Sequence, residues 1–327
     1  MAAATESSAF DEVVDEVRDA LGAGSVTELV RLTGGASRET WTCVVDGLRV
    51  VVQRQRPGAD RDMSIEADVL RAARAAGVPV PEVLAYIPHE AVGGDPGGGA
   101  TLVTRHVAGE TIARKILRDD RYAAARETLA AELGRALARV HRIRTEQVSG
   151  LDAIDPTVVY RERLDEIGEP HPAFELAFQW LHEHRPPAPQ SVGVVHGDFR
   201  LGNVIVDDGG LQAVIDWELA HLGDPMEDLG WLCVPAWRFG SRLPAAGVGT
   251  REQLFAAYGA EAGVTVDPEV VRWWEVSGIL RWGMICVTQA HTHTSGVVRS
   301  HELAAIGRRV CENEHDLFLA LEGRWTR

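Results

Sequence analysis

The 327-residue sequence predicts an α+β fold in two lobes, with a β-rich N-terminal lobe and a mainly helical C-terminal lobe. In the first third of the chain, short apolar, β-branched runs alternate with turn residues. The rest carries long helical patterns interrupted by one β-rich insert. The length fits two units of ordinary size. We place the boundary near Gly109, which gives lobes of residues 1–107 and 108–327 with a cleft between them.

The N-terminal lobe is expected to contain two helices and a sheet. The stretch from Phe10 to Leu21 has its apolar side chains on one helical face. Asp46 and Gly47 separate two β-like runs and predict a hairpin, because this dipeptide tolerates the positive φ angles of a tight turn. The other expected elements are strands at 25–32, 41–45, 48–53, 83–87 and 101–107 and a helix at 64–76.

The C-terminal lobe is expected to be helical around a small β-rich insert. Leu129, Leu133, Leu137 and Val140 form the buried stripe of one long helix. Helices are expected at 123–142, at 161–184 with a break near 169–172, and from 251 onward, and strands at 193–195, 204–206 and 213–215.

Composition narrows the classes of function. The net charge is -15, and binding nucleic acid through phosphates needs a basic face, so this class is disfavoured. The acidity is explained either by solubility or by an acidic cleft that attracts a cationic substrate. The four cysteines lie far apart, which argues against zinc and against a disulfide framework. The start of the chain does not resemble a signal peptide and no apolar run could span a membrane, so we expect a cytoplasmic protein without a membrane partner.

The segment from His196 to Asp216 contains the residue types that phosphoryl transfer needs. An apolar run leads into His196 and Asp198, Asn203 follows, and Asp216 ends the next apolar strand. The reaction needs a carboxylate that orients the acceptor hydroxyl and takes its proton, and oxygen ligands that hold Mg²⁺ beside the phosphates. A hairpin between these residues would bring them to one wall of the cleft.

This pattern resembles the signature of the kinase-like phosphotransferases of the aminoglycoside phosphotransferase and choline kinase superfamily. That signature is His-x-Asp-x-x-x-x-Asn followed by an Ile-Asp-Trp type of metal motif, here His196, Asp198, Asn203 and Ile215–Glu218; residues 223–230 continue the likeness. The resemblance implies a two-lobed, protein-kinase-like fold with ATP and Mg²⁺ as cofactors. It also implies that Asp198 is catalytic and that Asn203 and Asp216 bind the metal.

Neighbouring residues are expected to support the site. We expect His196 to brace the catalytic loop, and Arg200 either to touch phosphate or to lie at the surface. Glu218, which ends the metal motif, is grouped with them. Structural roles are expected for Asp224 and Asp228, with Asp224 capping the helix that follows.

The resemblance places the nucleotide in the N-terminal lobe. Gly34, Gly35 and Ser37 lie in a strand-loop-strand segment that would let backbone amides approach phosphate, although an ordinary turn also explains the glycines. Adenine would bond to backbone groups near Arg105 and Val107.

The phosphate-binding cation is where this sequence departs from the family. Glu66 matches the helical Glu that holds the cation, but the preceding strand has no Lys. Arg54 is our first choice as the partner of Glu66, and Gln53 competes for the inward position because side chains alternate along a strand. The missing Lys makes a pseudokinase-like nucleotide-binding module an alternative to an enzyme. A small-molecule sensor or scaffold without nucleotide is a third interpretation.

The acceptor is the least defined part of the site. Trp274, Arg281 and Trp282 lie in a segment that shapes the acceptor pocket in this family, although the spacing of the aromatic residues also fits core packing. The sequence also resembles kinase domains, active on hydroxyacyl-CoA, that are attached to acyl-CoA dehydrogenases. We therefore expect a small hydroxylated metabolite, a hydroxyacyl-CoA or an antibiotic such as an aminoglycoside as the substrate of a monomer or homodimer.

Overall fold

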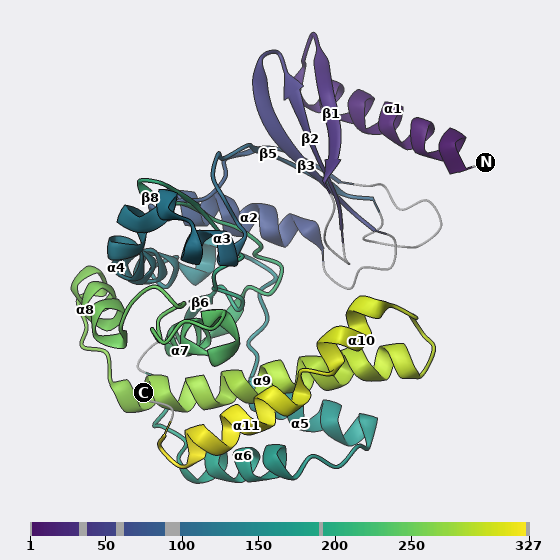
Figure 1. The fold of residues 1–327 in the computed structure, drawn as a ribbon. Helices are drawn as coiled ribbons and strands as arrows, with labels where there is room; N and C mark the ends of the chain where they lie inside the picture. The colour runs from purple at the N-terminus through teal and green to yellow at the C-terminus, as the bar shows by residue number, and fades with distance from the viewer. Residues whose placement is uncertain (1, 33–37, 57–61, 89–98, 190–191, 325–327) are drawn as a thin grey trace.

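The N-terminal part of the chain forms a five-stranded antiparallel sheet with a helix across one face (Figure 1). The computed structural model describes residues 2–32, 38–56, 62–88, 99–189 and 192–324. The elements of this part are α1 (Ala2–Leu21), β1 (Val26–Leu32), β2 (Arg38–Val45), β3 (Leu48–Gln55), α2 (Met63–Ala75), β4 (Val83–Ile87) and β5 (Thr101–Arg105). The strand order is β1-β2-β3-β5-β4.

Alternation along the strands gives the sheet two different faces. Trp41 and Val50 are buried together with Val13 and Val17 of α1, so this helix covers one face. Thr42 and its neighbours on the other face line a cleft. The sheet therefore has a structural face and a face open to a ligand.

The hairpin predicted at Asp46 and Gly47 is present. Val45 pairs with Leu48, and the two turn residues have φ angles of 46° and 83°. Two consecutive positive φ angles are typical of the tight turn that matches strand twist. This turn fixes the β2–β3 register and thereby decides which side chains of β3 face the cleft.

The rest of the chain is mainly helical, as predicted. Its helices are α3 (Ala113–Arg118), α4 (Ala123–Val140), α5 (Pro156–Ile167), α6 (Pro172–Glu183), α7 (Met226–Cys233), α8 (Arg251–Ala262), α9 (Pro268–Thr294), α10 (His301–Gly307) and α11 (Val310–Leu321), with short 3₁₀ turns at Asp120–Tyr122, Thr145–Gln147 and Pro235–Arg238. The predicted stripe of α4 is fully buried. The long helix α9 runs beneath α7 and beside α5 and α11 (Figure 1). Within the described residues, no helix is both long and apolar enough to cross a membrane.

The β-rich insert consists of two short antiparallel pairs. Strand β6 (Gly193–Val195) pairs with β9 (His221–Gly223), and β7 (Val204–Asp207) pairs with β8 (Gly210–Val214). The sequence did not predict β9. The loop after β6 carries His196 and Asp198. Asp216 lies two residues after the end of β8. The two pairs of strands therefore bring these side chains close together. The lobe division after residue 107 stays a prediction.

Candidate active site

A cleft of about 730 Å³ lies between the sheet and the helical lobe. Its walls include Gln53 from β3, Glu66 from α2, and Asn203 and Asp216 from the C-terminal lobe. This volume is in the range of small-molecule and cofactor sites. Glu66, expected at the nucleotide, and Asn203 and Asp216, expected at the metal, therefore share one cavity.

The carboxylate of Asp198 is held by three side chains. Trp231 Nε1 donates to Oδ1 at 2.9 Å, and Asn203 Nδ2 donates to Oδ2 at 2.6 Å. Arg200 Nε lies 3.0 Å from Oδ1 and 3.2 Å from Oδ2. A carboxylate offers about four acceptor positions, and these contacts use two on each oxygen, with the one Arg200 N–H shared between both oxygens. Sequence reasoning missed Trp231, which directly follows the recognised motif residues in α7.

His196 joins the catalytic loop to the strand end that carries Asp216. Its Nδ1 accepts from the backbone N–H of Asp198, and its Nε2 lies 3.2 Å from the carbonyl oxygen of Ile215. Because a carbonyl only accepts, Nε2 carries the proton and the ring is neutral. Complete burial lowers the pKa of His196, which favours this neutral form. The geometry places His196 as a brace between the two acids.

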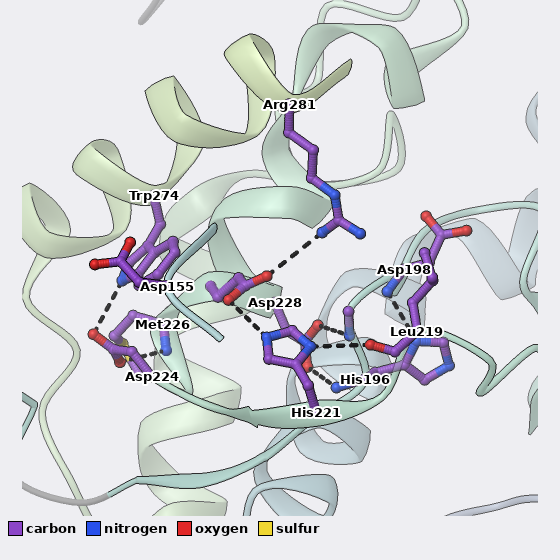
Figure 2. Close-up of polar contacts among 12 residues, drawn as sticks. Asp155, His196, Asp198, Leu219, His221, Asp224, Met226, Asp228, Trp274 and Arg281 are labelled. Carbon is purple, nitrogen blue, oxygen red and sulfur yellow. Dashed lines mark hydrogen bonds and ion pairs between the residues drawn. The ribbon is translucent and has the colours of Figure 1, made fainter. Parts of the chain in front are cut away.

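Asp228 anchors the same loop through its carboxylate (Figure 2). Its Oδ2 accepts from the backbone N–H of His196 at 2.8 Å and its Oδ1 from that of Gly197 at 3.0 Å, while His141 Nε2 lies 3.1 Å from Oδ2. Burial acts to raise the pKa of Asp228, but the bonds from His141 and His196 outweigh it and hold the pKa below its usual range. Gly197 has a φ of 80°, and a Cβ there would lie 2.4 Å from the Leu219 carbonyl oxygen. Only glycine fits this loop.

Asp216 has an unusual backbone conformation and lies near other negatively charged side chains. Its φ of 67° is in the left-handed region, which residues other than glycine seldom adopt. Burial raises the pKa of Asp216 to about 7, and Glu218, Asp198 and Glu66 add to the shift by repulsion. The charge of Arg38 acts in the opposite direction and offsets part of this repulsion.

The oxygen donors at this position fit Mg²⁺. Asn203 uses its amide nitrogen to donate to Asp198, at 3.0 Å to the carbonyl and 2.6 Å to Oδ2. Its amide oxygen is therefore the atom left for a metal, and Asp216 adds carboxylate oxygens. Mg²⁺ usually takes only one or two protein oxygens and completes its shell with phosphates and water.

Arg38, at the start of β2, forms an ion pair with Glu66. Its Nη2 lies 2.5 Å from Glu66 Oε2 and 3.5 Å from Glu218 Oε2. Burial acts to lower the pKa of Arg38, but the charges of Glu66, Glu218 and Asp216 outweigh it and raise the pKa. Among the described residues, Arg38 Nη1 is buried without a hydrogen-bond partner. A buried guanidinium donor in a cleft suits an anion such as phosphate.

The predicted pairing of Arg54 with Glu66 is wrong. Arg54 lies on the α1 face of the sheet, with its Nη2 2.7 Å from Glu16 and its Nη1 3.3 Å from Glu12. Gln53 lines the cleft instead, as strand alternation allowed. The cation that holds Glu66 therefore comes from β2 rather than β3.

The remaining predicted nucleotide contacts divide into two groups. Gly34, Gly35 and Ser37 lie outside the described residues. Arg105 and Val107 line the cleft. The side chain of Arg105 pairs with Glu82 at 2.8 Å, and its N–H donates to the Glu82 carbonyl, also at 2.8 Å. The Nε and the backbone N–H of Arg105 are thus engaged by Glu82.

The three residues predicted for the acceptor have different surroundings. Trp274 is buried, and its Nε1 donates to Asp224 Oδ2 at 3.0 Å, so it belongs to the core. Arg281 lies over the ring of Trp231 at 4.4 Å, beside the catalytic loop in Figure 2. Trp282 is partly buried and contacts another tryptophan. Asp224 also accepts from the backbone N–H of Met226 at 2.9 Å, which is the expected cap of α7.

Comparison with known proteins places this site in a family. The model of the phosphotransferase enzyme family matches residues 28–274, which include Arg38, Glu66, Asp198 and Asp216. The chain belongs to this family. Solved structures show the predicted kinase-like fold: a choline/ethanolamine kinase family protein from Mesorhizobium loti superposes with a TM-score of 0.65 at 19% identity, covering 95% of this chain and 97% of that one.

The chain is also similar to proteins with other names. A spectinomycin phosphotransferase, solved with ADP and spectinomycin, superposes with a TM-score of 0.66 at 11% identity, covering 95% of this chain and 98% of that one. Mouse acyl-CoA dehydrogenase family member 10 is 26% identical over 272 residues, which are 75% of this chain and 24% of the relative. Rat family member 11 is 25% identical over 76% of this chain and 34% of its own length. The chain thus spans about a quarter to a third of these two relatives.

Proposed function

We propose that the chain transfers the γ-phosphoryl group of ATP to a hydroxyl group of a small molecule, with Mg²⁺ bound. The main support is that Arg38 and Glu66 line the same cleft as Asp216 and as Asn203, whose amide holds the carboxylate of Asp198. A cation for phosphate, two metal-ligand side chains and a base are the parts this reaction needs. Two structural neighbours bound to ADP or AMP-PNP agree with a nucleotide in this cleft.

The chain's own residues would carry the proton and orient the acceptor. The acceptor hydroxyl would donate to Asp198 in place of one of the two contacts of the shared Arg200 N–H, and Asp198 takes its proton as the acceptor oxygen bonds to the γ-phosphorus. The bond between that phosphorus and the β–γ bridging oxygen breaks, and ADP and a phosphomonoester are the products. Trp231, Asn203 and Arg200 hold the carboxylate in one orientation, which reduces the entropy lost in reaching the transition state. Mg²⁺, when held by Asn203 and Asp216, offsets the phosphate charge.

The nucleotide would be held mainly by the N-terminal lobe. Arg38, steadied by Glu66, would donate to the phosphates in place of the missing β3 lysine. The carbonyl of Arg105 and the backbone of Val107 would bond the adenine. A cytoplasmic location, where ATP is supplied, and a monomer or homodimer belong to the same proposal.

The test is a nucleotide-consumption screen with Mg·ATP against hydroxylated metabolites, hydroxyacyl-CoAs and aminoglycosides. We expect ADP release with at least one class, a product heavier by one phosphate in mass spectrometry, and no release with Asp198→Ala. Full activity of a folded Asp198→Ala variant would contradict the assignment.

A nucleotide-binding module without turnover is the second candidate, because Gln53 rather than a lysine of β3 faces the cleft. Calorimetry separates the two functions. Tight Mg·ATP binding with no product from any acceptor favours the module. If ATP and Mg²⁺ bind in neither calorimetry nor thermal shift, both candidates fail and a sensor or scaffold is favoured.

A further inference from the structure

Three indole rings extend from the catalytic carboxylate into the helical lobe. Trp231 donates to Asp198, its ring centroid lies 5.1 Å from that of Trp237, and Trp237 lies 4.9 Å from Trp282. We call Trp231, Trp237 and Trp282 the tryptophan row. The row begins at the carboxylate that would hold the acceptor hydroxyl, and its rings are packed in the core of the helical lobe.

The guanidinium group of an arginine lies over each ring of the row. The distances from guanidinium carbon to ring centroid are 4.4 Å for Arg281 over Trp231, 4.6 Å for Arg200 over Trp237 and 5.5 Å for Arg309 over Trp282. Arginine over an indole face is a favourable contact that also holds the planar group in place. Arg200 contacts Asp198 and Arg281 interacts with its charge, whereas Arg309 lies at the far end of the row.

Arg281 has the longest ion-pair contact of these three arginines. Among the described residues its one ion-pair partner is Glu227, at 3.5 Å, and Glu227 also binds His221 Nε2 at 3.1 Å. Arg281 keeps 12% of its side chain exposed. Burial acts to lower the pKa of Arg281, but Tyr160, Glu227 and Asp198 outweigh it and raise the pKa, so the group stays charged. One long contact leaves most of its five N–H donors for another group.

The row itself adds donors without acceptors. The Nε1–H groups of Trp237 and Trp282 are buried and have no hydrogen-bond partner in the part of the chain that the structure describes. Trp237 is only 6% exposed. Buried donors are normally paired. These two unpaired indole N–H groups are hydrogen-bond donors, which suits a ligand with acceptor oxygens.

We infer that the acceptor carries an anionic group, a carboxylate or a phosphate, in addition to its reacting hydroxyl, and that Arg281 binds this group beside the tryptophan row. The inference rests on the proposed phosphoryl transfer. A guanidinium matches the two oxygens of a carboxylate or phosphate with parallel hydrogen bonds. A polycationic acceptor such as an aminoglycoside would meet like charges here.

Matched acceptor pairs test the charge preference. Glycerol 3-phosphate is compared with glycerol, 4-hydroxybutyrate with 4-hydroxybutyramide, and hygromycin B serves as the cationic acceptor, each with Mg·ATP and ADP release as the signal. We expect the anionic member of at least one pair to be used with a kcat/KM about tenfold or more above its neutral partner, the size of one charge-assisted hydrogen bond. Whether the phosphate or the carboxylate pair responds identifies the anion.

Variants of Arg281 test the residue. Arg281→Met keeps much of the packing over Trp231 and removes the charge, so KM for the anionic acceptor should rise about tenfold or more while KM for its neutral partner stays. Arg281→Lys should retain part of the preference. Arg272→Met is the control, because Arg272 also lies on α9 over a tryptophan, Trp180, at 5.5 Å, and its removal should leave the preference unchanged.

A binding measurement makes the inference independent of turnover. Glycerol 3-phosphate and 4-hydroxybutyrate are titrated into protein saturated with Mg·AMP-PNP, with tryptophan fluorescence as the signal; the change should be absent in Arg281→Met. The inference is overturned if neutral acceptors are used with the same kcat/KM as anionic ones. It is also overturned if Arg281→Met lowers kcat/KM equally for both members of a pair. Either result leaves the proposed function standing. If no acceptor releases ADP, the proposed function fails; an Arg281-dependent fluorescence change then still supports the anion site, and its absence overturns that too.

Discussion

Arg38 and Glu66 form an ion pair across the cleft wall, with 2.5 Å between Nη2 and Oε2. The two side chains are 12% and 5% exposed. When one partner of such a buried pair is removed, the other is left as an unpaired charge away from water, which costs more than the pair itself contributes. The pair therefore links the position of β2 to that of α2, and it fixes the guanidinium where phosphates would bind.

Arg38→Met should lower kcat/KM for ATP strongly. The expected loss is about 10- to 150-fold, which corresponds to about 1.5–3 kcal/mol for a hydrogen bond to a charged group. Arg38→Lys keeps the charge but not the forked geometry, so its loss should be smaller. Steady-state kinetics with varied ATP and calorimetry of Mg·AMP-PNP binding measure both effects.

Arg54→Met is the matched control, since Arg54 pairs with Glu12 and Glu16 of α1 on the opposite face of the sheet. Its kcat/KM for ATP should equal that of the wild type, and only the melting temperature should fall slightly. If instead Arg54→Met loses affinity for ATP and Arg38→Met does not, the phosphate-binding role belongs to β3.

The sequence predicted the kinase-like fold, but it did not predict that Arg38 is the partner of Glu66. The hairpin at Asp46 and Gly47 fixes the β3 register from two residues, and strand alternation then put Gln53 in the cleft. Arg38 carries no such local signal, because its approach to Glu66 depends on how β2 and α2 pack, and these are separated by a strand and a loop. Trp231 was missed for the same reason: its contact with Asp198 is made by the packing of α7 against the catalytic loop.

Asp216→Asn should abolish transfer without destabilising the protein. The substitution removes a negative charge that is crowded by Glu218, Asp198 and Glu66. It also places Asn, which tolerates left-handed backbone, at a φ of 67°. We therefore expect an equal or higher melting temperature together with a loss of Mg²⁺-dependent activity. A fall in melting temperature would show that Asp216 supports the fold.

Asp198→Asn is the companion variant. It keeps the shape of the side chain but removes the proton acceptor, and loss of a general base typically lowers kcat by about 10²- to 10⁴-fold. Asp208→Asn, in the exposed β7–β8 turn, is the control and should retain wild-type kcat. Single-turnover measurements with saturating Mg·ATP distinguish a slow chemical step from weak nucleotide binding. A folded Asp198→Asn variant with wild-type kcat would exclude Asp198 as the base.

Asp228 should make stability depend on pH in the acid range. Because the pKa of Asp228 is lowered in the folded protein, its contribution is fully present above the unfolded value of about 3.9. That contribution is lost as the pH falls through the lower folded value. Asp228→Asn should lower the free energy of unfolding by about 3–5 kcal/mol at neutral pH, the cost of breaking a buried pair.

The difference between wild type and Asp228→Asn should therefore shrink below about pH 4. Urea unfolding at pH 7, 5, 4 and 3 measures it. A difference that stays constant to pH 3 would mean that the hydrogen bonds to His196 and Gly197 stabilise the loop without any contribution from the charge.

Gly230→Ala tests whether the contact between α7 and α9 positions the catalytic carboxylate. A Cβ at Gly230 would lie 2.5 Å from Trp274 Cβ and 2.8 Å from the backbone nitrogen of Glu275, so α7 must move away from α9. Overpacking of this kind costs about 1–3 kcal/mol. The same movement displaces Trp231, the next residue along α7, from Asp198. Stability and kcat should therefore both fall, whereas Gly24→Ala, where the nearest atom is a side-chain oxygen at 3.6 Å, should change neither. A Gly230→Ala protein that loses stability but keeps wild-type kcat would show that the Trp231 bond to Asp198 is not needed for transfer.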